Sequence, residues 1–140
     1  MPHQPLEYFE GISSSDFYVW CCSAAYDARI FGDFKEYDAA LVIRDQRAFT
    51  DRLERTMKAK LGGGQMQSGR VAYYDPYDVD PASLRPIFVK NFQYLYQNEQ
   101  RFAWEVGAGQ KEKDLFVELG PLSDICEVLE FKSGPTGPAI

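Results

Sequence analysis

Apolar and polar residues follow distinct patterns along this chain, and each pattern predicts a different kind of element. Residues 17–23 (FYVWCCS), 39–43 (AALVI) and 70–74 (RVAYY) are short and rich in β-branched or aromatic side chains, which is typical of strands. Residues 101–106 (RFAWEV) alternate between apolar and polar side chains, and 115–119 (LFVEL) is a further predicted strand. Apolar side chains fall on both faces of 17–23, so we expect that strand at the centre of its sheet.

Residues 45–61 carry the clearest helical pattern. Four apolar residues recur every four positions and so form one stripe along the helix: Phe49, Leu53, Met57 and Leu61. Asp45 is suited to cap the first turn, and the glycines at 62–64 are suited to end the last one. We expect this helix to be the longest in the chain and to pack on a sheet that contains 17–23 and 39–43.

The intervening segments predict shorter elements. Residues 24–34 are irregular or form a short helical turn, 87–89 form a short strand, and 92–98 fit more than one conformation. Residues 107–114 are a polar, hairpin-like connection, and 122–131 are a short helix or turn that leads into a last strand.

Strands outnumber helices and do not alternate with them, which favours an α+β fold. We expect one mixed or mostly antiparallel sheet of about five to six strands, with one main helix packed on it. Residues 1–132 form a single globular domain in this interpretation, and 133–140, with two glycines and two prolines, form a flexible C-terminal tail.

The acidic composition of the chain limits the kinds of molecule it is expected to bind. The 140 residues include 15 Lys plus Arg and 21 Asp plus Glu, a net charge of −6. Such a surface repels a phosphate backbone, so we expect no direct nucleic-acid binding and consider a basic protein surface the better partner. The basic residues at 52–60 are interrupted by Asp51 and Glu54, which is typical of a solvated helix face.

Three cysteines, Cys21, Cys22 and Cys126, give an odd count without a repeated spacing. Neighbours on a strand point to opposite faces, so Cys21 and Cys22 are poorly placed to pair. We predict buried free thiols in a reducing compartment. Residues 1–10 lack the apolar core of a signal peptide, and no apolar run reaches the roughly 20 residues of a membrane span. We therefore expect a cytoplasmic protein without membrane contact.

Familiar catalytic and metal-binding patterns are missing from the sequence. His3 is the single histidine and lies near the start of the chain, so neither a metal-ligand cluster nor a Ser–His or Cys–His pair is easy to build. The glycines at 62–64 end a helix and lack the Lys-Ser/Thr of a phosphate loop. We expect no bound metal and no cofactor, and we favour a protein without enzymatic activity.

One short element nevertheless has catalytic character. Gln97 and Glu99 stand two residues apart just before a predicted strand, where extended backbone places both side chains on one face. This spacing resembles the Gln-x-Glu element of ADP-ribosyltransferases, and the resemblance implies that Glu99 would be the catalytic acid of an NAD-using domain, complete or degenerate. The alternative interpretation makes both residues turn residues, with Glu99 paired to Arg101.

The loop at 73–80 (YYDPYDVD) is the candidate binding site. Its tyrosines and aspartates are Tyr73, Tyr74, Asp75, Tyr77, Asp78 and Asp80. Tyrosine offers a large contact area at low entropic cost, and aspartates attract a basic partner. The alternative is a proline-stiffened turn whose tyrosines fold back on the core.

A looser resemblance rests on four stretches taken together. They are 17–23, the run FGDFKEYDAALVIRD at 31–45, the pattern YQNEQRF.W at 96–104, and LGPLSDI at 119–125. Together they resemble a widespread, uncharacterised family of bacterial and prophage proteins. The resemblance suggests a bacterial or phage origin and implies no reaction. Members of that family are longer, so this chain would lack an N-terminal part.

Three functions remain after these observations. The favoured one is a small acidic binding factor, an inhibitor, immunity or counter-defence protein that docks on another protein. The second is an ADP-ribosyltransferase-like domain centred on Glu99, and the third is a structural or homo-oligomeric subunit with no ligand. Oligomeric state stays open at this point.

Overall fold

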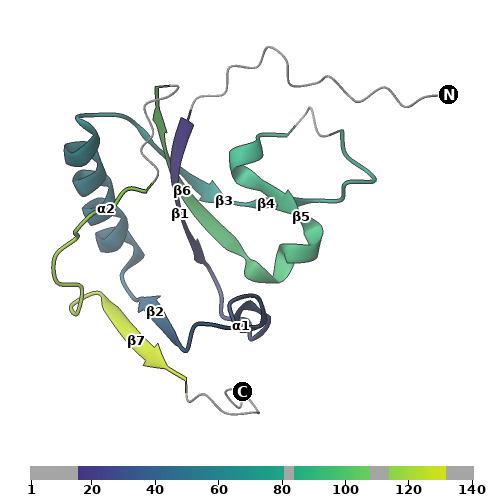
Figure 1. Ribbon diagram of the computed structural model, residues 1–140, viewed down its shortest axis with the longest axis horizontal. Helices are drawn as coiled ribbons and strands as arrows, with labels where there is room; N and C mark the ends of the chain where they lie inside the picture. Colours follow the sequence, from purple (N-terminus) through teal and green to yellow (C-terminus); the bar gives the residue numbers. More distant parts are fainter. Residues whose placement is uncertain (1–15, 81–83, 108–113, 132–140) are drawn as a thin grey trace.

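Three small β-sheets and one long helix form the part of the chain that the computed structural model describes, residues 16–80, 84–107 and 114–131. The largest sheet has three antiparallel strands in the order β1-β6-β3, and their bounds are Asp16–Ser23 for β1, Glu99–Val106 for β6 and Met66–Arg70 for β3. The predicted strands 17–23 and 101–106 are thus present. Figure 1 shows this sheet in the middle of the molecule.

Two further sheets have two strands each. Strands β2 (Ala39–Ile43) and β7 (Cys126–Glu130) pair antiparallel, and β4 (Ala72–Tyr74) and β5 (Val89–Asn91) pair parallel. The α+β class with mostly antiparallel pairing is confirmed. The single sheet was an incorrect expectation, because the strands divide among three.

Helix α2 (Gln46–Leu61) is the longest helix among the described residues, as predicted. The Asp45 carboxylate accepts a hydrogen bond of 2.9 Å from the Ala48 N–H, which caps the first turn. Gly62 ends the helix in the left-handed region at φ 70°, a conformation that glycine adopts without strain. Local sequence therefore determines both ends of α2.

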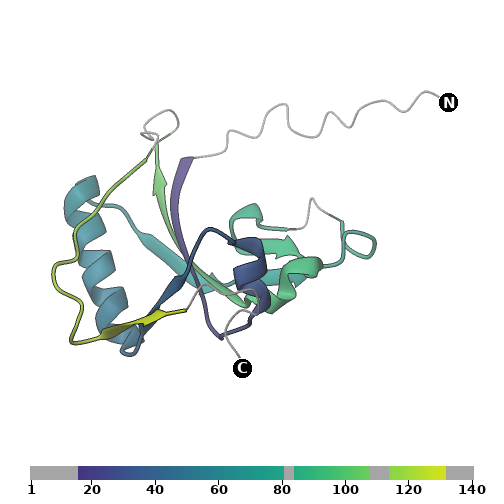
Figure 2. The same cartoon turned by 60° about the horizontal axis from the view of Figure 1, so that its bottom comes forward.

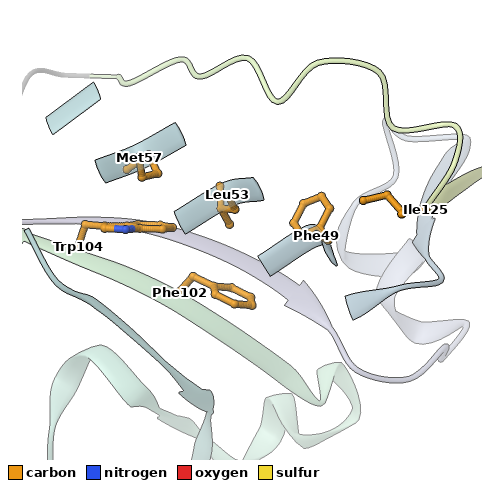
Figure 3. Packing of buried hydrophobic residues seen from close by; sticks show 6 residues of the cluster. All are labelled: Phe49, Leu53, Met57, Phe102, Trp104 and Ile125. Atoms are coloured by element: carbon orange, nitrogen blue, oxygen red, sulfur yellow. The ribbon is translucent and has the colours of Figure 1, made fainter. Parts of the chain in front are cut away.

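The apolar stripe of α2 builds the core against one face of the β1–β6–β3 sheet. Phe49, Leu53 and Met57 are each 4% exposed. They face Phe102 and Trp104 of β6, with Ile125 closing one end of the cluster (Figure 3). The helix was expected to pack on a sheet holding both 17–23 and 39–43, which is wrong, because the second of these is β2 and lies in a different sheet.

The other face of the three-stranded sheet carries the short elements. They are α1 (Arg29–Asp33), the 3₁₀ helices η2 (Pro86–Phe88) and η3 (Phe92–Gln97), and the β4–β5 pair. Both views place α2 on one side of β1 and β6 and the β4–β5 pair on the other (Figures 1 and 2). The segment that the sequence left ambiguous, 92–98, is mainly η3.

Some strand predictions need correction. Strand β1 was expected at the centre of its sheet, but it is an edge strand and β6 is central. The predicted strand 70–74 is interrupted at Val71, so β3 ends at Arg70 and β4 begins at Ala72. The predicted strand at 115–119 is extended but belongs to no sheet among the described residues. Leu115, Val117 and Leu119 pack on the core instead, which explains their alternation.

The tail predicted at 133–140, the lead-in with His3 and most of the connection at 107–114 lie outside the described residues. Within the described residues, no helix is long and apolar enough to cross a membrane.

Candidate functional site

A cluster of charged side chains lies on the sheet face opposite α2, and Glu99 is at its centre. Because side chains alternate along a strand, Phe102 and Trp104 of β6 point to α2 while Glu99 and Arg101 point to the other face. The Glu99 side chain is only 12% exposed. A carboxylate this far from water needs partners, and the neighbouring elements provide two cations.

Lys90 of β5 and Arg101 of β6 hold the Glu99 carboxylate. The Lys90 Nζ atom is 3.4 Å from Glu99 Oε1, and Arg101 Nε donates a hydrogen bond to Glu99 Oε2. Arg101 Nη1 also donates to the Ile87 carbonyl at 2.9 Å. The sequence-based alternative, a pair between Glu99 and Arg101, is therefore present, and Lys90 extends it to a third charged group.

Gln97 joins this cluster to α1. Its side chain is 7% exposed, its Oε1 accepts from Lys90 Nζ at 2.5 Å, and its Nε2 donates to Asp33 Oδ2 at 2.8 Å. The Tyr96 hydroxyl donates to the same Asp33 oxygen. These two hydrogen bonds lower the pKa of Asp33 below its ordinary value.

The polar side chains of the cluster therefore hydrogen-bond to one another. The sequence predicted that extended backbone would place Gln97 and Glu99 on one face, but Gln97 ends η3, and the two side chains meet through Lys90, which hydrogen-bonds to both. Between them, Asn98 adopts the left-handed region at φ 41°, so the chain turns from η3 into β6 at this point. This arrangement fits a structural network that fastens η3, β5 and α1 to the central strand.

Two prominent surface hollows in the described part of the molecule lie elsewhere. One of about 390 Å³ is lined by Arg52, Arg55, Thr56, Leu119 and Pro121. The other, of about 370 Å³, lies between α2, β1 and the extended residues 114–117. Neither is lined by Gln97 or Glu99, or by any residue of the loop at 73–80.

The cysteines differ from expectation in their burial. Cys21 is exposed, while Cys22 and Cys126 are half-buried, and all three are free. Cys21 escapes burial because β1 is an edge strand and because its side chain points away from α2. Surrounding protein atoms partly desolvate the Cys21 sulfur and raise the pKa of the thiol, and the Glu99 charge raises it further.

Metal ligands do not gather in the described ranges, where no group of three His, Cys, Asp or Glu side chains is placed to hold an ion. His3 lies outside these ranges.

The tyrosine loop divides into an inward and an outward part. Tyr73 and Tyr74 belong to β4 and are half-buried, and the Tyr73 hydroxyl accepts a hydrogen bond of 2.9 Å from the Glu99 N–H. Tyr77, four residues after Tyr73, is 93% exposed. The alternative in which the tyrosines fold back on the core is wrong for Tyr77. Tyr73 and Tyr74 turn inward, but neither packs against the core cluster under α2.

Hydrogen bonds hold the tip of the loop in a defined turn. The Asp75 carboxylate accepts from the Tyr77 N–H at 2.9 Å, and the Asp75 carbonyl accepts from the N–H groups of Asp78 and Val79 at 3.1 and 3.2 Å. This is an Asx-type turn, in which an aspartate fixes its own following backbone. Asp78 and Asp80 are exposed beside Tyr77. The loop therefore presents one aromatic ring flanked by carboxylates.

Comparison with known proteins gives no match to a family model, a curated protein or a solved structure. The likeness to bacterial and prophage proteins and the likeness to ADP-ribosyltransferases both remain predictions from the sequence.

Proposed function

We propose that this chain is a cytoplasmic protein-binding factor that docks on another protein through the loop at 73–80, with Tyr77 as the central contact. The observation that carries the proposal is the 93% exposure of Tyr77 on a hydrogen-bonded turn. Tyrosine is enriched among the residues that dominate binding energies, and a ring exposed to this extent can be buried by a partner while its hydroxyl keeps a hydrogen bond.

The turn supports the proposal because it reduces the entropy lost on docking. Asp75 fixes the backbone of Tyr77 and Asp78, and the Tyr73 hydroxyl ties the start of the loop to the Glu99 N–H of the central strand. A loop already held in one conformation binds more tightly than a floppy one with the same contacts.

Charge supports a basic partner. The chain has a net charge of −6, and the exposed Asp78 follows Tyr77 directly in the sequence. Complementary charge speeds association, most strongly at low salt. A small acidic protein that covers a basic surface on its target is suited to act as an inhibitor, and an immunity or counter-defence role in a bacterium is the form of the proposal that the sequence likeness favours.

The competing function, an ADP-ribosyltransferase-like domain, loses support from the surroundings of Glu99. A glutamate that stabilises an oxocarbenium-like centre must face a ligand pocket. Glu99 instead faces Lys90 and Arg101, and its side chain is 12% exposed.

An affinity capture tests the proposal. Wild-type protein, Tyr77→Ala and Tyr37→Ala are immobilised at equal density and exposed to a bacterial lysate, and retained proteins are identified by mass spectrometry. Tyr37 is the matched control, since it is 66% exposed but lies outside the loop. We expect a protein that wild type and Tyr37→Ala retain and Tyr77→Ala loses. Equal retention by all three proteins contradicts the proposed role of Tyr77.

A further inference from the structure

The outer edge of β7 is open in the described part of the molecule. Strand β7 pairs with β2 alone, and both views place it at the periphery of the fold (Figures 1 and 2). Four of its five residues are exposed. Two-stranded sheets are marginally stable, and an open edge offers unpaired N–H and C=O groups to another strand.

The hydrogen bonds at the two ends of the β2–β7 pair, called the ribbon below, show which backbone groups of β7 point away from β2. The Phe131 N–H donates to the Asp38 carbonyl at 2.7 Å, and the Arg44 N–H donates to the Ile125 carbonyl at 2.8 Å. Hydrogen-bonded pairs alternate along an antiparallel ladder, so Glu127 and Leu129 of β7 bond inward to β2. The outward groups of the β7 edge therefore belong to Cys126, Val128 and Glu130. The Cys126 N–H already donates to the Leu122 carbonyl at 2.8 Å, so Cys126 offers only its C=O to an added strand.

These outward groups fit a second copy of the same strand. When two β7 strands pair antiparallel about a two-fold axis at Val128, Val128 faces Val128 of the other copy and Cys126 faces Glu130. Only this register uses all three outward residues of both strands. It also sets Glu127 opposite Leu129, so no two carboxylates lie directly opposite each other, an arrangement that would be destabilising.

The same register joins exposed apolar side chains into one row. Leu41 lies opposite Val128 within the ribbon, and the two side chains are 50% and 60% exposed. In the paired ribbons the row reads Leu41, Val128, then Val128 and Leu41 of the second copy, all on one face of a four-stranded sheet. Branched side chains in such cross-strand pairs stabilise a sheet.

The open edges of the three-stranded sheet are less accessible. Residues 114–117 lie beside β1 around a shared hollow. Near β3, the Phe88 ring lies 3.9 Å from the Cβ position of Gly69, and Arg85 donates to Gln67 at 2.7 Å. Strand β2 lies between β7 and the rest of the molecule (Figure 1). The edge of β7 that does not pair with β2 faces away from the rest of the described fold (Figure 1).

We infer that two copies of this chain associate through their β7 edges, with Val128 on the two-fold axis, to form a four-stranded sheet β2-β7-β7-β2. This goes beyond the proposed docking of Tyr77, since it involves a different surface and a second copy of the chain. The contact uses one short strand edge from each copy, which is small beside the roughly 800 Å² a side of a standard interface, so we expect a weak dimer.

Substitutions that place a positive or a negative charge at Val128, on the two-fold axis, test this register. Val128→Lys and Val128→Glu each place like charges directly opposite each other, whereas an equal mixture of the two places opposite charges there. Analytical ultracentrifugation up to about 1 mM covers the expected range. We expect wild type and Val128→Thr to dimerise, each charged variant alone to stay monomeric, and the mixture to dimerise again. Circular dichroism checks that the variants are folded.

Amide hydrogen exchange gives a second readout that needs no substitution. In wild type, the Val128 and Glu130 amides should become more protected as concentration rises, while the inward Glu127 and Leu129 amides are protected at every concentration. A monomer at about 1 mM overturns the inference. So does a wild-type dimer that both charged variants retain, or a mixture that stays monomeric.

Discussion

The Glu99 cluster and the loop at 73–80 were both candidate sites in the sequence, and they differ in where their polar and aromatic groups point. In the cluster, Glu99 is 12% exposed and is held by Lys90 and Arg101. In the loop, Tyr77 is 93% exposed and only its backbone is held. Groups that bind one another stabilise the fold, whereas a side chain fixed at its backbone and free at its ring is available to a partner.

Tyr73 joins the two regions and belongs to the inward one. Its hydroxyl accepts from the Glu99 N–H, while Tyr77 extends into solvent four residues later. Substitutions within this one loop should therefore separate stability from binding, and the predictions below run from the largest expected effect to the smallest.

Removing Glu99 should have the largest effect on stability. Glu99→Ala leaves Lys90 and Arg101 without their shared counter-charge, and we expect the free energy of unfolding to fall by about 2–3 kcal/mol, somewhat less than for a fully buried pair. Urea titration measures this change. Glu105→Ala, at an exposed position of the same strand, is the control and should change stability by less than about 0.5 kcal/mol. A loss that small for Glu99→Ala would contradict the structural role of the cluster.

Removing the Tyr73 hydroxyl should lower the free energy of unfolding by less than removing Glu99 does. Tyr73→Phe deprives the Glu99 N–H of its acceptor, so the free energy of unfolding should fall by about 1 kcal/mol. Tyr77→Phe is the matched change in the same loop and should leave stability unchanged, since that side chain is exposed. Equal effects of the two variants would contradict the division of the loop.

Acid should weaken the link between Gln97 and α1. Hydrogen bonds from Tyr96 and Gln97 lower the pKa of Asp33 in the folded state. The stabilisation is therefore present above the unfolded pKa of about 4 and is lost as pH falls through the lower folded pKa. Asp33→Asn should show a shallower loss of melting temperature between about pH 5 and 2 than wild type. Asp51→Asn on α2 is the control, and a wild-type slope for Asp33→Asn would refute this assignment.

NAD hydrolysis and ADP-ribosyl transfer should both be absent. With Glu99 held by two cations, we expect no transfer of label from NAD to protein and no release of nicotinamide. The assay uses labelled NAD with wild type and Glu99→Gln. Label that wild type transfers and Glu99→Gln does not would reverse the ranking of the two functions.

The main helix and two of the strands of the largest sheet could be predicted because their determinants are local. Asp45, the four-residue stripe and Gly62 define α2, and the aromatic runs define β1 and β6. The apolar run at 115–119 predicted a strand that the structure does not form, because apolar composition does not show whether the backbone has a ladder partner. Leu115, Val117 and Leu119 pack on the core, while Phe116 is 84% exposed. The polar strand β3, MQSGR, has no such pattern.

The candidate sites could be predicted only in part. The spacing of Glu99 and Arg101 is local and indicated their pairing. Lys90 and Asp33 reach the cluster from β5 and α1, and no sequence pattern links those segments to β6. The sequence could not predict the exposure of Tyr77 either, since YYDPYDVD fits a loop that folds inward as well as one that turns outward.

The most direct test of the central claim is the affinity of the captured partner for wild type, Tyr77→Ala and Tyr37→Ala, measured by titration calorimetry at low and high salt. We expect Tyr77→Ala to weaken binding by about 2 kcal/mol, roughly 30-fold, with its melting temperature unchanged. Tyr37→Ala should bind as wild type does, and wild-type association should weaken with salt. Full affinity in a folded Tyr77→Ala variant would contradict the account.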